Sequence, residues 1–189
     1  ENFVTYDGKM GKHHLNMVAG HTFQRESYHT LAAKGVSMPE PYYLQINNGE
    51  TRDANSYESE HVLTSYIGRI NYDYKGKYLV DFSGRYDGTS KFAKGSRWGV
   101  FPSASLGWRI SEEEFAKDAN WIDDLRVRAT HGVSGKQLSS AFPYTNLLSV
   151  SESNGAPSLS LSSVGNRNLS WERNKQIDLG VDFRLWDRV

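Results

Sequence analysis

The chain has 189 residues with 22 basic and 22 acidic side chains, so its formal net charge at pH 7 is zero. A neutral chain argues against a nucleic-acid partner, and the lack of cysteine excludes disulfides, thiolate nucleophiles and cysteine-based metal sites. No apolar run is long enough for a transmembrane helix, but this does not exclude barrel strands, which are apolar only at every second residue.

Alternation of apolar and polar residues predicts seven antiparallel strands. The first covers residues 1–6 and ends at a turn over 7–12, and the second runs from about residue 13 to 26. The third and fourth form a hairpin over 66–88, and the pattern of the third can be extended back to about Glu58. The remaining three are expected at 97–110, 124–133 and 171–184.

The hairpin YIGRINYDYKGKYLVDFSGRYDG carries its apolar residues at even positions on both strands. The residue numbers of two opposed residues must therefore add up to an even number. A three-residue loop with Gly76 at positive φ gives this pairing. A two-residue loop would place aromatic residues opposite charges. The predicted pairs are Tyr74 with Tyr78, Tyr72 with Val80, Ile70 with Phe82, Gly68 with Gly84 and Tyr66 with Tyr86.

Two segments resemble helices. The segment 111–118, SEEEFAKD, starts with a capping box of Ser111 and Glu114, and a weaker signal covers SYHTLAAKG at 27–35. The segments 27–57 and 135–168 are rich in Gly, Ser, Asn and Pro and are expected to be long connections without strands.

Short connections alternate with longer ones along the chain, so an up-and-down sheet gathers them at opposite ends. Bacterial outer-membrane barrels have this layout, with short periplasmic turns and long extracellular loops. The apolar face would then contact outer-membrane lipid and the polar face a wet lumen. Two aromatic girdles are expected: Tyr72, Tyr74, Tyr78, Trp108 and Trp121 at the short-turn end, and Tyr66, Tyr86, Trp98 and Trp171 at the long-loop end.

Three stretches carry a family resemblance: GRINYDYKGKYLVDFSGRYDGTSKFAKGSRWGVFPSASLGWRISEEEFAKD, WIDDLRVRATHGVSGKQ and LSWERNKQIDLGVDF. They resemble the barrel of SusC/RagA-type TonB-linked outer-membrane transporters, densely over 66–137 and well over 165–189. The resemblance implies a barrel of about 22 strands closed by a plug. It also implies import of glycans, oligopeptides or other large nutrients, a SusD-like surface lipoprotein as partner, and TonB as a partner of the plug.

Residues 1–189 are accordingly expected to be an incomplete segment of the barrel, contributing about seven strands and no plug. The expected function is that of barrel wall and surface loops in a nutrient importer. The main alternative is a soluble β-sandwich carbohydrate-binding module, which would need a second sheet over the apolar face. A passive porin or adhesion barrel is a third, weaker possibility.

Nine charged residues are expected to face the lumen, as substrate or plug contacts or as a mutually paired, solvated wall: Arg69, Asp81, Arg85, Asp87, Arg109, Arg126, Arg128, Glu172 and Asp178. Four loop aromatics are candidates for stacking on sugars or packing on a partner: Tyr42, Tyr43, Phe142 and Tyr144. The six histidines show no metal spacing, and no catalytic motif or cofactor site is expected.

Overall fold

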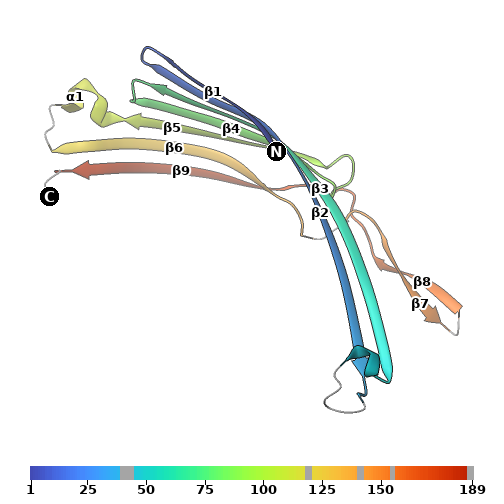
Figure 1. Ribbon diagram of the computed structural model, residues 1–189. Helices are drawn as coiled ribbons and strands as arrows, with labels where there is room; N and C mark the ends of the chain where they lie inside the picture. Colours follow the sequence, from blue (N-terminus) through green and yellow to red (C-terminus); the bar gives the residue numbers. More distant parts are fainter. Residues whose placement is uncertain (39–44, 118–120, 140–142, 154–155, 187–189) are drawn as a thin grey trace.

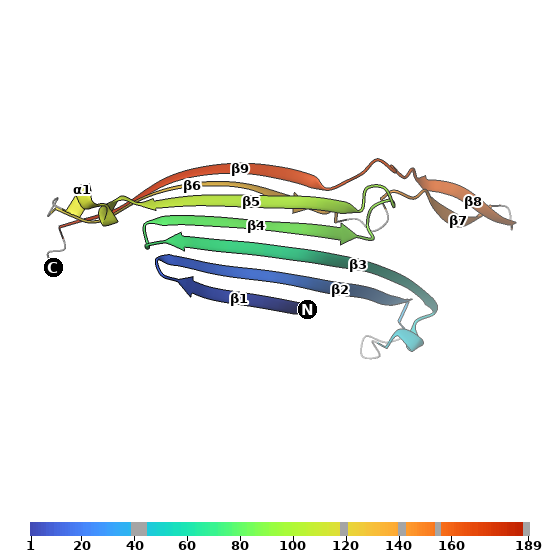
Figure 2. The ribbon, with the colours of Figure 1, turned by 90° about the horizontal axis from the view of Figure 1, so that it is seen from above.

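The computed structural model describes residues 1–38, 45–117, 121–139, 143–153 and 156–186. Within these ranges seven strands form one antiparallel sheet in chain order, and two more form a separate hairpin (Figures 1 and 2). The sheet contains β1 (Asn2–Met10), β2 (His13–Val36), β3 (Thr51–Tyr74), β4 (Tyr78–Thr89), β5 (Trp98–Arg109), β6 (Ile122–Lys136) and β9 (Glu172–Leu185). The hairpin contains β7 (Leu147–Ser153) and β8 (Ala156–Ser163).

The connections are segregated as the sequence predicts. The turns after β1, β3 and β5 lie at one end of the sheet, called here the turn end, and the connections after β2, β4 and β6 lie at the other, the loop end (Figure 2). The first turn is shorter than expected, because β1 runs through Met10. The edge strands β1 and β9 do not pair with each other within the described residues, so the sheet is not a closed barrel.

The predicted register of the β3–β4 hairpin is confirmed. All five expected pairs are present, from Tyr74 with Tyr78 to Tyr66 with Tyr86. Gly76 has φ +68° as expected, and Lys75 before it also has a positive φ of 58°. The Gly76 N–H donates a hydrogen bond to Asp73 Oδ1 at 2.6 Å, which helps to fix this loop.

One face of the sheet is apolar, and no described element covers it. A row of six residues crosses the sheet in register: Leu15, Tyr72, Val80, Leu106, Ala129 and Leu179. Leu106 is 59% exposed and Leu179 is 82% exposed. The β7–β8 hairpin lies beyond the loop end (Figure 2). A soluble sandwich would bury this face, so the structure does not favour the binding-module alternative.

The two long connections contain strands that the sequence did not predict. The helix expected near residues 27–35 is wrong, because β2 continues to Val36 and pairs with β3 from Thr51 onward. This part of the β2–β3 pair passes the ends of its neighbours and curves away from them (Figure 1). The segment 135–168 was likewise wrongly expected to lack strands. Leu148 and Val150 on β7 face Leu161 and Leu159 on β8 and alternate with serines. This short alternation indicates strands, but the Gly, Ser, Asn and Pro content of the segment led to the prediction of a loop.

The predicted helix at 111–118 is much shorter in the structure, and its capping box is absent. A 3-10 turn covers Ile110–Glu112, and α1 covers only Glu114–Lys117. The Ser111 hydroxyl donates to Asp124 Oδ1 at 3.2 Å and so binds β6 instead of capping a helix. Among the described residues, no helix is long and apolar enough to cross a membrane.

The expected aromatic girdles are present with one correction. Tyr66, Tyr86 and Trp98 stack on the apolar face at the loop end. Trp171 does not join them, because it lies just before β9 and is only 9% exposed. It packs edge-on against Phe92 and Phe101 to form the small hydrophobic core of the described residues. Phe101 belongs to the opposite, polar face of β5.

Candidate functional site

The candidate site is the polar face of the sheet, where the register places the predicted lumen residues. On β3 and β4, Arg69 Nε donates to Asp81 Oδ2 at 2.8 Å. Farther toward the loop end, the Arg85 guanidinium donates to both oxygens of Asp87 at 3.3 Å. Asp87 is only 7% exposed. These four residues therefore form two ion pairs along the wall, as expected for a mutually paired surface.

A packed group of aromatic residues lies at the loop end of the polar face. Phe101 and Trp171 border an open hollow of about 410 Å³, which Arg85 and Asp87 also line. The Trp171 indole N–H donates to the carbonyl oxygen of Arg97 at 2.8 Å, which ties the segment before β9 to the β4–β5 loop. Packed aromatic rings beside an ion pair provide a preformed surface with both apolar and charged groups.

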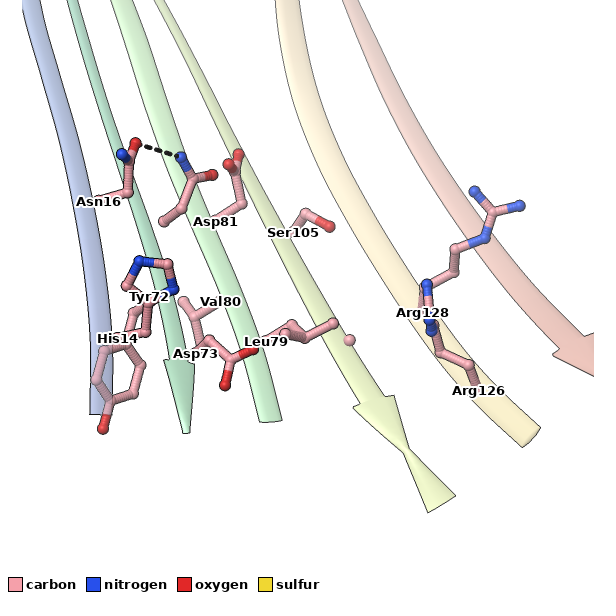
Figure 3. A pocket seen from close by; sticks show the side chains of 12 residues that line it. His14, Asn16, Tyr72, Asp73, Leu79, Val80, Asp81, Ser105, Arg126 and Arg128 are labelled. Carbon is pink, nitrogen blue, oxygen red and sulfur yellow. Dashed lines mark hydrogen bonds between the residues drawn. The ribbon is translucent and has the colours of Figure 1, made fainter. Parts of the chain in front are cut away.

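A second hollow of about 290 Å³ lies toward the turn end of the polar face (Figure 3). Ser105 and Gly107 on β5 have small or no side chains, so they leave a depression between taller neighbours. Asp81 lies on one side of β5, and Arg126 and Arg128 lie on β6 at the other side. The hollow therefore has a carboxylate side and a guanidinium side.

The remaining predicted charges differ in how they are paired. Arg109 Nε lies 3.8 Å from Asp124 Oδ1, and Arg128 Nε lies 3.3 Å from Asp182 Oδ2. Asp178 accepts a hydrogen bond from the Gln176 amide at 3.0 Å. Two predicted residues have no ion pair within the described part of the chain: Glu172, which is exposed opposite Lys136, and Arg126.

A polar clasp holds the turn end together. The Glu113 carboxylate accepts hydrogen bonds from the Tyr78 hydroxyl at 2.6 Å and from the Trp108 indole N–H at 3.2 Å. Lys77 Nζ also donates to it at 3.2 Å. The Tyr78 hydroxyl, then the Trp108 and Lys77 donors, stabilise the charged form and lower the pKa of Glu113 to about 2. The clasp thus joins two girdle aromatics to the β5–β6 connection.

Comparison with known proteins identifies the family to which this chain belongs. The family model described as "TonB dependent receptor-like, beta-barrel" matches residues 2–189. The chain belongs to the TonB-dependent receptor β-barrel family. This finding confirms the fold class expected from the sequence, with the all-β antiparallel sheet as part of a barrel wall.

Relatives within the TonB-dependent receptor family include SusC and RagA-type proteins. The chain is 32% identical over 194 residues to "TonB-dependent receptor P3" of Formosa agariphila, covering 99% of this chain and 19% of that protein. It is 32% identical over 189 residues to "TonB-dependent receptor SusC" of Bacteroides thetaiotaomicron, covering 96% of this chain and 19% of that protein. These relatives confirm the resemblance to SusC/RagA-type transporters.

Solved structures agree with the sequence relatives of this TonB-dependent receptor chain. The RagAB peptide importer in its closed-closed state superposes with a TM-score of 0.89 at 25% sequence identity. The match covers 98% of this chain and 21% of that one. The chain therefore spans about a fifth of the length of the relatives that it matches.

The structure describes one of the four predicted loop aromatics. Tyr42, Tyr43 and Phe142 lie outside the described residues, and Tyr144 is half-buried in the turn before β7. Their role in stacking on sugars or packing on a partner stays a prediction.

The sequence analysis missed a tyrosine pair on the extension of β2 and β3. Tyr28 and Tyr57 are 63% and 55% exposed, and their ring centroids lie 6.5 Å apart. Continuing the register beyond the pair of His13 with Tyr74 would have placed these two rings diagonally across the strands. The pair was missed because the segment 27–57 was interpreted as a loop.

The described residues contain no cluster of three or more His, Asp or Glu side chains that could hold a metal ion. The named relatives are receptors or transporters, and no positive evidence of catalysis accompanies them.

Proposed function

We propose that this chain forms part of the barrel wall and of the outer connections of a TonB-linked importer in the bacterial outer membrane. The observation that carries the proposal is the division of one sheet into an apolar face with two aromatic girdles and a polar face lined with charges. In a large outer-membrane barrel these faces contact lipid and lumen respectively.

The spacing of the girdles supports a membrane-spanning wall. Ten residues separate Trp98 from Trp108 on β5, which corresponds to about 33 Å along a strand rising ~3.3 Å per residue. A strand tilt of about 40° reduces this distance to about 25 Å along the membrane normal, the height of the apolar band in such barrels.

The cargo proposed for the whole protein is a large solute, either a glycan or a peptide. The RagAB complex is named as a peptide importer, and the SusC/RagA resemblance implies glycans as well as oligopeptides. We also propose that the 189 residues are one segment of a larger barrel. The plug that contacts TonB would then come from another part of the whole protein, and a SusD-like lipoprotein would be its partner at the surface.

The wall assignment can be tested with single cysteines, because this chain contains none. In the full-length protein, freed of any other cysteine, Ser103→Cys and Ser105→Cys should react with a small hydrophilic maleimide. Ala104→Cys and Leu106→Cys should be shielded by lipid and react slowly in intact cells. Equal labelling at all four positions would contradict a wall between lipid and lumen.

Import can be tested by deleting the gene for the full-length protein. Cells are offered fluorescent maltoheptaose or a fluorescent decapeptide, and uptake is measured with and without a protonophore. Loss of energy-dependent uptake of either probe in the deletion strain, restored by the intact gene, would support import and identify the class of cargo. Unchanged uptake and growth on every glycan and peptide supplied would contradict the proposed function.

A further inference from the structure

The polar face carries an excess of arginine where β5, β6 and β9 reach the turn end. The register places Arg109 opposite Arg126, Arg126 opposite Asp182, and Asp124 opposite Arg184. Arg128 lies two residues along β6 on the same face. Four side chains are here called the arginine corner: Arg109, Arg126, Arg128 and Arg184. Since a guanidinium stays charged in proteins, four positive groups share two carboxylates, Asp124 and Asp182, on the described parts of β6 and β9. Asp73 and Asp81 line the far side of the adjoining hollow, and Asp81 already pairs with Arg69.

Both of these carboxylates already have partners. Asp182 lies 3.3 Å from Arg128 Nε, although it is directly opposite Arg126 in the register. Asp124 lies 3.8 Å from Arg109 Nε and also accepts a hydrogen bond from Ser111. The next carboxylate on this face of β9, Asp178, is four residues farther along, which is about 13 Å at the usual strand rise.

Arg126 is left without a counterion in the described part of the chain. Its Nε is buried and has no hydrogen-bond partner there, and the same is true of the Nε of Arg109, whose contact with Asp124 is too long for a hydrogen bond. Like charges directly opposite each other destabilise a sheet, and buried donors normally find an acceptor. Two buried Nε donors of the corner are therefore left without an acceptor among the described residues.

The space beside Arg126 suits a carboxylate. Arg126, Arg128 and Ser105 border the hollow of about 290 Å³ (Figure 3). Gly107 also lines it. A guanidinium presents a planar fork of N–H groups that matches the two oxygens of a carboxylate. The small residues Ser105 and Gly107 leave room for such a group to approach from the open side of the polar face.

We propose that the arginine corner is a carboxylate-binding site, with Arg126 as its main donor. The inference rests on the proposed function in one respect, namely that the polar face lines a lumen. Two sources can supply the carboxylate: an acidic solute in the lumen, or an acidic side chain of another segment of the whole protein lying inside the barrel. The chemistry of recognition is the same for both.

The test uses the full-length protein with Arg126→Gln, which removes the charge, and Arg126→Lys, which keeps the charge but loses the fork. Lys94→Gln removes one positive charge from the exposed β4–β5 loop and is the matched control. Binding of tetragalacturonate and of its neutral methyl ester is measured by calorimetry. Ion conductance of each variant in planar bilayers is measured in parallel.

If a solute supplies the carboxylate, Arg126→Gln should weaken tetragalacturonate binding about tenfold or more, because a hydrogen bond to a charged group is lost. The methyl ester should bind weakly to every variant. If a segment inside the barrel supplies it, tetragalacturonate binding should not change, but Arg126→Gln should conduct more than wild type. In either case Arg126→Lys should be intermediate and Lys94→Gln unchanged.

The proposal is wrong if Arg126→Gln matches Lys94→Gln both in tetragalacturonate affinity and in conductance. Arg126→Lys keeps the test valid if the glutamine variant fails to fold. A negative result of this kind would leave import of neutral solutes untouched, so the carboxylate site and the proposed function can fail separately.

Discussion

Replacing Trp171 should weaken the loop end of the wall more than any exposed aromatic does. Trp171 is 9% exposed and packs on Phe92 and Phe101, which are 0% and 6% exposed. A tryptophan side chain buries about 150–250 Å², which corresponds to about 4–6 kcal/mol at about 25 cal/mol per Å². Truncation of a buried aromatic residue to alanine costs about 3–5 kcal/mol, and this is the loss expected for Trp171→Ala. Trp171→Phe should cost less, about 1–2 kcal/mol, mainly because the hydrogen bond to the Arg97 carbonyl is lost.

The assay is urea unfolding of the full-length protein in detergent, followed by the gel shift between folded and unfolded barrel. Phe115→Ala is the control, because this side chain is 69% exposed in α1, and it should stay within about 0.5 kcal/mol of wild type. If Trp171→Ala unfolds at the same urea concentration as Phe115→Ala, the cluster does not hold this part of the wall together.

Three further predictions concern the apolar face, the clasp and the core. Leu106→Arg should destabilise the protein by about 2–4 kcal/mol in lipid because it puts a charge in the apolar band, whereas Ser105→Arg on the polar face should be tolerated; similar unfolding midpoints for the two in liposomes would contradict the assignment of faces. Because the pKa of Glu113 is about 2, below its ordinary 4.5, its contribution is complete above pH ~4.5 and is lost as the pH falls toward 2. The unfolding temperature of Glu113→Gln should therefore be lower than that of wild type at pH 7 and equal to it at pH 2. If the difference between the two unfolding temperatures stays constant over this pH range, the clasp does not contribute in this way. Gly135→Val should cost about 1–3 kcal/mol in unfolding experiments because a Cβ there overlaps the Phe101 ring, and wild-type stability would show that this ring has room to move.

The sequence predicted those parts of the fold in which one face is apolar. The even-numbered apolar residues of the 66–88 hairpin determine its register, since a slip of one residue would exchange the faces. The same argument placed Leu106, Ala129 and Leu179 on one face although they lie far apart in the chain. Where apolar and polar residues alternate because one face of the strand is apolar, the sequence predicts both the position of the strand and its pairing.

The sequence failed where burial does not depend on alternation. Trp171 fits the apolar pattern of its strand, but it lies just outside β9 and turns toward Phe101 on the other face. No local pattern records a contact with a loop residue such as Phe92. The pairing of the charges on the polar face was also not predictable from the sequence, because Asp182 could pair with Arg126 or Arg128, and the structure places it beside Arg128.

The extended part of β2 and β3 shows why a polar strand can still be regular. Beyond Arg25 and Val62 the two strands pair with each other alone, so both faces and both edges are open to solvent. A two-stranded ribbon is marginal without further support. Here it continues a register already set by the seven-stranded sheet. Two cross-strand polar contacts lie on opposite faces, the ion pair of Arg25 with Glu60 and the contact of His61 Nε2 with Glu26 Oε2 at 3.1 Å. Each exposed pair contributes little, so the extension is held mainly by the sheet from which it grows.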